Sequence, residues 1–280
     1  MRPPTTMTPG DPAGTAQLSR GDHPSYREPV SFTADSHHVT EIIPARNVEP
    51  RRGDAVPTIL LMHYTGFASG PQAIDWLACT ESGVSCHYVI DVDGRTTQMV
   101  RERDRAWHAG ESCWHGETDI NSCSIGIEIQ NPGHDRGYPD FPPAQMEAVA
   151  RLSSDIIGRH TIPPDRVLAH SDIAPHRKID PGEKFNWRWL AERGIGLWVE
   201  PEPIVERHAD DQHRLSADSL TEVQAGLAAY GYDCSVTGVM CDRTRIVVAA
   251  FQRHFRPDRV DGIVDRSTRV TLERLLDALR

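Results

Sequence analysis

One unbroken apolar run constrains the fold of this chain most. Residues 58–62 read TILLM, and His63 follows them directly. A short and uniformly apolar segment is typical of a central strand that is buried on both faces. Residues 166–170 read RVLAH and predict a second short strand that also ends in a histidine. Because sites are usually assembled where strands end at the edge of a sheet, these two histidines are the first candidates for a functional site.

The neighbouring segments predict an α/β fold with a mixed central β-sheet flanked by helices. Residues 87–100 read as a hairpin that turns at an Asp-Gly pair. Residues 124–130 alternate, so that three isoleucines share one face of a strand. The opposite face of this strand consists of Gly126, Glu128 and Gln130. A helix opens at Pro143, and its apolar stripe consists of Met146, Val149, Leu152 and Ile156.

The sequence divides into four parts. Residues 1–31 are rich in proline and lack periodicity, which predicts an irregular segment. Residues 32–198 mix strands and helices and form the main domain. Residues 199–214 are rich in charge and contain two prolines, as a linker does. Residues 215–280 predict a small three-helix C-terminal domain, in which a glycine turn followed by an amphipathic helix occurs twice, at Gly238 and Gly262.

Composition and charge exclude several classes of protein. The formal net charge of −10 argues against unspecific binding to nucleic acid through a basic surface. No apolar run approaches the ~18 residues of a membrane span. The six cysteines form no C-x-x-C pair, which excludes a zinc ribbon and a thioredoxin-like motif. The N-terminus lacks the apolar core of a secretory signal, so we expect a cytoplasmic protein, or a periplasmic or wall-associated one if the chain was trimmed; the oligomeric state stays open.

A carboxylate completes the two histidines as a set of metal ligands. Asp180 follows His170 in the same segment and precedes a proline, which favours extended backbone. Two imidazoles and one carboxylate are the protein ligands of a catalytic zinc ion that keeps a fourth position open for water. The sequence therefore predicts one Zn²⁺ per chain, bound by His63, His170 and Asp180. Such an ion lowers the pKa of bound water to about 7 and polarises a carbonyl group.

Two further residues have the chemistry of catalytic groups. Glu128 is a carboxylate in the middle of an Ile-x-Ile-x-Ile strand, where it costs desolvation energy unless it is paired or faces a cleft. It lies either on the exposed face of an edge strand or beside the zinc-bound water as a general base. Lys178 is either a solvated loop lysine or the cation that stabilises the oxyanion of a tetrahedral intermediate.

Four blocks of sequence resemble the zinc-dependent N-acetylmuramoyl-L-alanine amidases of the AmpD type. In chain order they read LMHY at 61–64, WHAG at 107–110, SIGIE at 124–128 and HSDIAPHRKIDPG at 170–182. The last block is the most specific. The resemblance implies the amidase fold, which peptidoglycan-recognition proteins share. It also implies a zinc site formed by His63, His170 and Asp180, and catalytic roles for Glu128 and Lys178.

The reaction implied by this resemblance is hydrolysis of the amide bond between N-acetylmuramic acid, or its 1,6-anhydro form, and the L-alanine of the stem peptide. It serves cell-wall degradation or recycling, with either intact peptidoglycan or a soluble anhydromuropeptide as the substrate. Two alternatives belong to other classes, a non-catalytic peptidoglycan-recognition protein and a zinc peptidase that cuts within the stem peptide. The complete set of metal ligands argues against a non-catalytic recognition protein. Product analysis distinguishes the zinc peptidase from the amidase.

Five residues near these blocks are candidates for substrate binding: Tyr64, Arg105, Trp107, His108 and Asn121. Arg105 is expected to meet a substrate carboxylate and Trp107 a sugar or lactyl face; the alternatives are a surface arginine and a packed tryptophan. The resemblance places His108 in or near the substrate cleft and leaves His87 structural. Eight further histidines are expected on the surface: His37, His38, His134, His160, His176, His208, His213 and His254.

The C-terminal part resembles the three-helix peptidoglycan-binding module that is attached to cell-wall enzymes. The pieces that carry this resemblance are, in order, Val223-Gln224, Gly231-Tyr232, Gly238, Phe251-Gln252 and Asp261-Gly262-Ile263. The resemblance implies peptidoglycan as a partner and assigns no ligand-binding residue. The alternative is a small DNA-binding helical unit, because arginines stand at two helix starts. The net charge of −10 and the lack of a basic stripe argue against it.

Overall fold

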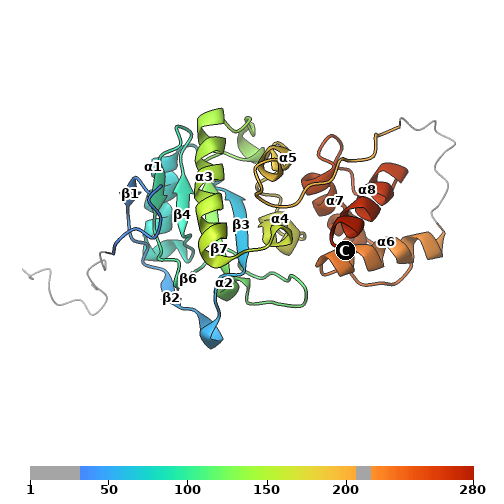
Figure 1. Ribbon diagram of the computed structural model, residues 1–280, viewed down its shortest axis with the longest axis horizontal. Helices are drawn as coiled ribbons and strands as arrows, with labels where there is room; N and C mark the ends of the chain where they lie inside the picture. The colour runs from blue at the N-terminus through green and yellow to red at the C-terminus, as the bar shows by residue number, and fades with distance from the viewer. Residues whose placement is uncertain (1–31, 206–215) are drawn as a thin grey trace, which may run out of the picture. The chain divides into compact units, whose positions relative to one another are not determined.

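A six-stranded mixed sheet forms the centre of the main domain (Figure 1). The computed structural model describes residues 32–205 and 216–280. The strand order is β1-β5-β4-β7-β3-β8, and all neighbours are parallel except β4 and β5. The predicted mixed sheet flanked by helices is therefore confirmed. The strands are β1 (Glu41–Ile42), β2 (Val48–Pro50), β3 (Ile59–Tyr64), β4 (Tyr88–Ile90), β5 (Thr96–Gln98), β6 (Asp104–Ala106), β7 (Ser124–Ile129) and β8 (Val167–Ala169).

Alternation in β3 and β7 sorts their side chains onto the two faces of the sheet. Leu60 and Met62 of β3 lie in the same cluster as the three isoleucines of β7, on the face that helix α3 covers. Ile59 and Leu61 belong to a different cluster, on the other face. His63 continues this second alternation, and Glu128 of β7 is its partner in the strand register. Because β3, β7 and β8 are parallel, their carboxyl ends meet at one edge.

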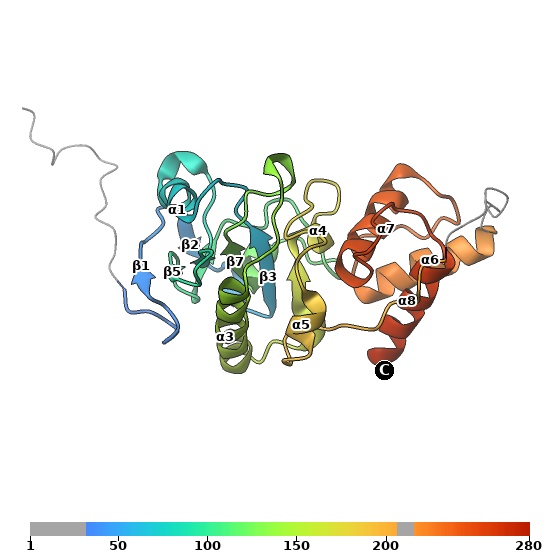
Figure 2. The same cartoon turned by 90° about the horizontal axis from the view of Figure 1, so that it is seen from above.

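Helices cover both faces of the sheet. Figure 2 shows α3 and α1 on opposite sides of the strands. The stripe predicted for α3 is confirmed, since Met146, Val149, Leu152 and Ile156 are all buried. The helices are α1 (Gly70–Ala78), α2 (Ile120–Cys123), α3 (Pro143–His160), α4 (His170–Ile173), α5 (Trp187–Ala191), α6 (Ala217–Tyr230), α7 (Asp242–Phe255) and α8 (Arg266–Ala278), with short 3-10 turns at Arg52–Asp54, Thr80–Ser82, His134–Arg136 and Pro164–Arg166.

The antiparallel parts of the fold are one predicted hairpin and one unpredicted ribbon. Strands β4 and β5 form the predicted hairpin, which turns at Gly94 with φ of +85°. Strands β2 and β6 pair with each other in a separate two-stranded ribbon. The sequence did not predict this ribbon, because three residues are too few to show alternation and Pro50 argues against a strand interior.

The C-terminal region contains the three predicted helices, α6, α7 and α8, and repeats one turn. Gln224 Oε1 accepts hydrogen bonds of 2.8 Å from the N–H groups of Gly238 and of the residue before it. Gln252 Oε1 does the same at Gly262, at 3.0 and 2.8 Å. Since both glycines have φ near +67°, the sequence repeat is two copies of one glutamine-bound turn. No helix within the described ranges is both long and apolar enough to cross a membrane.

One hydrophobic cluster contains residues of both the main domain and the C-terminal helices. Trp114 contacts Tyr230 and Tyr232, with ring centroids 5.3 and 5.1 Å apart. Tyr232 donates a 2.6 Å hydrogen bond to Asp172 Oδ1, and His254 Nδ1 lies 2.7 Å from Asp172 Oδ2. Asp172 is fully buried in α4, two residues after His170. The C-terminal helices thus contact the turn that begins with a candidate metal ligand.

The expectation that His254 lies on the surface is wrong. Its side chain is 1% exposed and stacks between Trp187 and Phe255, because the apolar face of α7 includes it. His37 and His176 are exposed as expected, while His38, His134 and His160 are half-buried. His208 and His213 lie outside the described residues, as do the predicted irregular segment 1–31 and residues 206–214 of the predicted linker.

Candidate active site

Three side chains from separate segments meet at the carboxyl edge of the sheet. His63 Nδ1 lies 2.9 Å from His170 Nδ1 and 3.2 Å from Asp180 Oδ2. His170 Nδ1 lies 3.1 Å from the same carboxylate oxygen. All three residues are buried. The structure thus brings together the three residues that the sequence named as metal ligands.

Different elements position these three residues. His63 is the fifth of six residues in β3, since Tyr64 still pairs with Ile129 of β7, so the strand does not end at the histidine. His170 is the first residue of α4, directly after β8. Asp180 lies in the following loop, where its peptide bond to Pro181 is cis. A strand, the start of a helix and a loop therefore bring their side chains together at one site.

The outer nitrogens of the two histidines are bonded to the protein. His170 Nε2 lies 3.0 Å from the carbonyl oxygen of Ala109, and a carbonyl only accepts, so this nitrogen carries the hydrogen. His63 Nε2 lies 3.1 Å from His108 Nδ1. Burial, with a smaller effect of His170, lowers the pKa of His63 to about 4, which keeps the His63 ring neutral at pH 7.

A chain of hydrogen bonds fixes the hydrogen positions on His63. Ser124 Oγ lies 2.6 Å from the carbonyl oxygen of Ile120 and must donate to it. Ser124 therefore accepts from His108 Nε2, at 3.3 Å. The other ring nitrogen of His108 then has no hydrogen and accepts from His63 Nε2; burial lowers the pKa of His108 well below its ordinary value, in keeping with a neutral ring. With each ring neutral and its hydrogen on Nε2, the Nδ1 atoms of His63 and His170 both present lone pairs to the site.

Glu128 lies beside these three residues. It is the register partner of His63, and it lines the same pocket as Asp180. Its Oε2 atom is buried and has no hydrogen-bond partner among the described residues. Burial and the charge of Asp180 raise the pKa of the Glu128 carboxyl well above its ordinary value, and Lys178 opposes them. The alternative of an edge strand is wrong, because β7 lies between β4 and β3.

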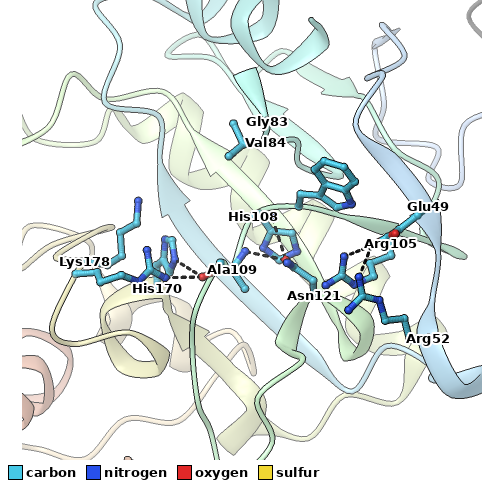
Figure 3. A pocket seen from close by; sticks show the side chains of 13 residues that line it. Glu49, Arg52, Gly83, Val84, Arg105, His108, Ala109, Asn121, His170 and Lys178 are labelled. Carbon is cyan, nitrogen blue, oxygen red and sulfur yellow. Dashed lines mark hydrogen bonds and ion pairs between the residues drawn. The ribbon is translucent and has the colours of Figure 1, made fainter. Parts of the chain in front are cut away.

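Two adjoining pockets, of about 530 and 480 Å³, open beside the site. The residues that line both are Val84, Trp107, His108, His170, Arg177 and Lys178. Figure 3 shows the first pocket, with Lys178 and His170 at one end and Arg105 and Glu49 at the other. Lys178 is half-buried and has no ion-pair partner in the part of the chain that the structure describes. Its ammonium charge is therefore free to act in the cleft.

All five residues that were predicted to bind substrate line one or both pockets. Trp107 Nε1 is buried without a hydrogen-bond partner among the described residues, whereas Tyr64 Oη lies 3.2 Å from a histidine nitrogen. Arg105 is ion-paired with Glu49 and with Asp119, so a substrate carboxylate would compete with two carboxylates of the chain. The two remaining candidates, His108 and Asn121, are buried and bonded within the protein.

His87 is also close to His108, but it is not available to a metal ion. Its Nδ1 accepts a 3.0 Å hydrogen bond from the N–H of Gly126. Its Nε2 donates to the carbonyl oxygen of Asp104, at 3.1 Å. Burial lowers the pKa of His87 to about 3, so the ring is neutral. Both nitrogens bind the backbone, which agrees with the structural role expected for His87.

Sequence reasoning missed two residues of the site. A Cβ atom on Gly126 would lie 2.5 Å from His108 Nδ1, so the absence of a side chain makes room for the His108 ring. A glycine inside a strand was the signal that could have found it. Arg177 lines both pockets and donates to the carbonyl oxygens of Ala109 and Glu111, at 2.8 and 3.0 Å. It stands beside Lys178 in the most specific block and carried no distinguishing signal of its own.

Comparison with known proteins identifies both folded parts. Residues 53–183 match the family described as N-acetylmuramoyl-L-alanine amidase, and residues 216–272 match a putative peptidoglycan binding domain. The N-acetylmuramoyl-L-alanine amidase AmiD of Escherichia coli (strain K12) is 37% identical over 233 residues, which cover 78% of this chain and 82% of that protein. The 1,6-anhydro-N-acetylmuramyl-L-alanine amidase AmpD of Enterobacter cloacae is 32% identical over 56% of this chain and 88% of its own length.

Solved structures agree with these matches. The complex of Escherichia coli AmiD with anhydro-N-acetylmuramic acid-L-Ala-D-gamma-Glu-L-Lys has a TM-score of 0.68 and 38% identity, and covers 81% of this chain and 91% of that chain. AmpDh3 of Pseudomonas aeruginosa in complex with anhydromuramic pentapeptide has a TM-score of 0.66 and 29% identity. It covers 92% of this chain and 98% of that chain. Both resemblances seen in the sequence are confirmed. This chain belongs to the N-acetylmuramoyl-L-alanine amidase family and carries a C-terminal peptidoglycan-binding domain.

Proposed function

We propose that this chain is a zinc-dependent amidase whose zinc ion is bound by His63, His170 and Asp180. As a member of its family, it hydrolyses the amide bond between the lactyl group of N-acetylmuramic acid and L-alanine. One observation carries the metal assignment. Three buried ligand atoms from three segments lie within 3.2 Å of one another, at an edge that also holds a buried carboxylate.

The chemistry of the three atoms fits a zinc ion. Both Nδ1 atoms present lone pairs, and Asp180 Oδ2, a carboxylate oxygen, lies within 3.2 Å of each of them. Three acceptors thus face one another with no hydrogen between them, which is repulsive unless a cation lies among them. Ligand atoms of a tetrahedral zinc ion lie about 3.3 Å apart, close to the 2.9–3.2 Å found here.

The residues of the chain supply proton transfer and charge stabilisation. When bound, the zinc ion polarises the amide carbonyl and makes water more acidic. Glu128 takes a proton from the attacking water as the new C–O bond forms, and returns it to the alanine nitrogen as the C–N bond breaks. Lys178 stabilises the negative charge that develops on the carbonyl oxygen. The products are a muramyl carboxylic acid and a peptide with a free L-alanine amino group.

Aromatic side chains of the cleft are assigned to substrate contact. Trp107 and Tyr64 supply apolar surface for the sugar and lactyl groups. Arg105 lies at the far end of the first pocket, where its charge is already paired with Glu49 and Asp119.

The proposed substrate is a muropeptide with a 1,6-anhydro sugar, because the AmiD structure that this chain resembles contains such a substrate. Intact peptidoglycan is a second candidate. The match of residues 216–272 to a peptidoglycan binding domain favours it, since a second binding module raises the local concentration of a polymeric substrate.

Product analysis tests the proposed reaction. The purified chain is incubated with anhydro-N-acetylmuramic acid carrying L-Ala-D-γ-Glu-L-Lys and, separately, with sedimented cell wall. We expect mass spectrometry to detect a peptide-free sugar together with a peptide that begins with L-alanine. Cleavage inside the stem peptide, or binding without cleavage, would contradict the proposal. The Asp180→Ala variant is the matched control, because it lacks a proposed zinc ligand and should release no sugar.

A further inference from the structure

The dipeptide His108-Ala109 contacts both candidate zinc-binding histidines at Nε2, the ring nitrogen that does not face the site. His63 Nε2 lies 3.1 Å from His108 Nδ1. Figure 3 shows the second contact, in which His170 Nε2 donates to the carbonyl oxygen of Ala109, at 3.0 Å. The two histidines come from β3 and α4, which are distant in sequence. The dipeptide is therefore a common support at which the orientations of both rings are set.

The dipeptide is itself fixed by the surrounding chain. Asn121 Oδ1 accepts hydrogen bonds from the N–H groups of His108 and Ala109, at 3.0 and 2.8 Å (Figure 3). The ring of His108 is bonded to Ser124 at its far side, and it lies over the strand at Gly126, where a Cβ atom would approach it to 2.5 Å. Contacts within the protein therefore hold both the backbone and the ring of His108.

We propose that His108 is a positioning residue for the zinc site, and that Asn121 holds the His108-Ala109 dipeptide for this role. The inference rests on the proposed zinc function, and it replaces the expectation that His108 contacts substrate. The hydrogen-bond chain from Ser124 leaves His108 Nδ1 as an acceptor, so His63 keeps its hydrogen on Nε2 and directs the Nδ1 lone pair to the site. Without this acceptor, zinc binding must also select the ring orientation and tautomer of His63.

Two substitutions at one position isolate the acceptor. His108→Leu keeps the approximate size of the side chain and removes the acceptor, whereas His108→Asn retains an oxygen near the position of Nδ1. Zinc affinity is measured by competition with a chelator of known affinity, and thermal unfolding of the zinc-free protein reports on folding. We expect His108→Leu to weaken zinc binding about 10- to 100-fold, as loss of such a partner typically does, and His108→Asn to restore most of the affinity. Unchanged affinity in a folded His108→Leu variant would overturn the proposal.

A second pair of variants tests the role of Asn121. Asn121→Ala removes the acceptor that holds the dipeptide, while Asn131→Ala is the matched control. Asn131 is also buried and also accepts a backbone hydrogen bond, from Gly133, but it makes no hydrogen bond to His108 or Ala109. Both variants are expected to lose stability. A fall in zinc affinity is expected for Asn121→Ala alone, and equal affinities in the two variants would contradict the role of Asn121.

A readout on the unaltered chain does not depend on the folding of any variant. Long-range ¹H–¹⁵N correlation spectra of the imidazole rings identify the tautomers in zinc-free protein at pH 7. We expect the Nε2–H tautomer for both His63 and His108, and an Nδ1–H tautomer of His108 would overturn the proposal. Failure of the proposed function looks different. A wild-type chain that binds no zinc contradicts that function, whereas tight wild-type binding with unchanged His108→Leu binding contradicts this inference alone.

Discussion

Gly126→Ala is expected to damage the site through one methyl group. Gly126 lies within strand β7, in backbone that alanine also adopts, so the substitution introduces no backbone strain. Its Cβ atom would lie 2.5, 2.6 and 2.7 Å from three ring atoms of His108, where ordinary contacts are about 3.5–4.0 Å. The ring must therefore retreat by about 1 Å. Because His63, His87 and Ser124 surround it, we expect a cost of about 1–3 kcal/mol, as for other overpacked cores.

Denaturant unfolding of the zinc-free protein measures this cost. Gly158→Ala is the matched control, because Gly158 lies in α3, is exposed, and has nothing within 4 Å of its added Cβ atom. The control is expected to gain about 0.5–1 kcal/mol from the better helix propensity of alanine. Gly126→Ala should also bind zinc more weakly, since the displaced ring no longer reaches His63. A Gly126→Ala variant as stable as the wild type, with the same zinc affinity, would refute this reasoning.

Three further predictions concern separate groups. Glu128→Gln should lower kcat about 100-fold or more while zinc content is unchanged, and activity within a few-fold of wild type would contradict its role as acid–base group. Burial raises the pKa of Glu102, but hydrogen bonds with His160 and Arg159 outweigh this effect and lower the pKa to about 2 against an ordinary 4.5. Glu102 therefore stabilises the fold by about 3 kcal/mol above pH 4.5, and this contribution is lost as the pH falls towards 2. In urea unfolding, the free energy of unfolding of Glu102→Gln should therefore lie well below that of the wild type at pH 7, and the difference should shrink at pH 2 to 3. A difference that stays constant with pH would contradict this. Tyr232→Phe removes the hydroxyl bonded to buried Asp172 and should cost about 1.5–3 kcal/mol in the same assay, so an unchanged free energy of unfolding would show that this contact contributes nothing.

Much of the fold could be predicted because its main elements carry strong periodic signals. The apolar run that became β3, the alternating β7 and the stripe of α3 each bury a continuous set of side chains. Short elements carry no such signal, which explains why the β2–β6 ribbon was missed. His254 was misplaced for another reason: its polarity suggested the surface, although its spacing from Phe251 puts it on the buried face of α7.

The candidate site was predictable where chemistry and sequence position coincide. His63 comes directly after the apolar residues of β3, His170 follows β8, and Asp180 stands in the most specific block, so the three could be named before their geometry was known. The contacts that hold His63 and His170 in place could not be predicted. The contacts of His108 with His63 and of Ala109 with His170 join residues 45 and 61 positions apart, through a ring orientation and a backbone carbonyl that no local pattern encodes.

Zinc content tests the central claim most directly. Elemental analysis of the chain purified without chelator should find one zinc ion per chain. In Asp180→Ala, which removes one of the three ligand atoms, zinc should fall far below stoichiometry while thermal unfolding still shows a folded protein. A wild-type chain without stoichiometric zinc, or an Asp180→Ala variant that retains a full complement of zinc, would contradict a catalytic zinc site formed by His63, His170 and Asp180.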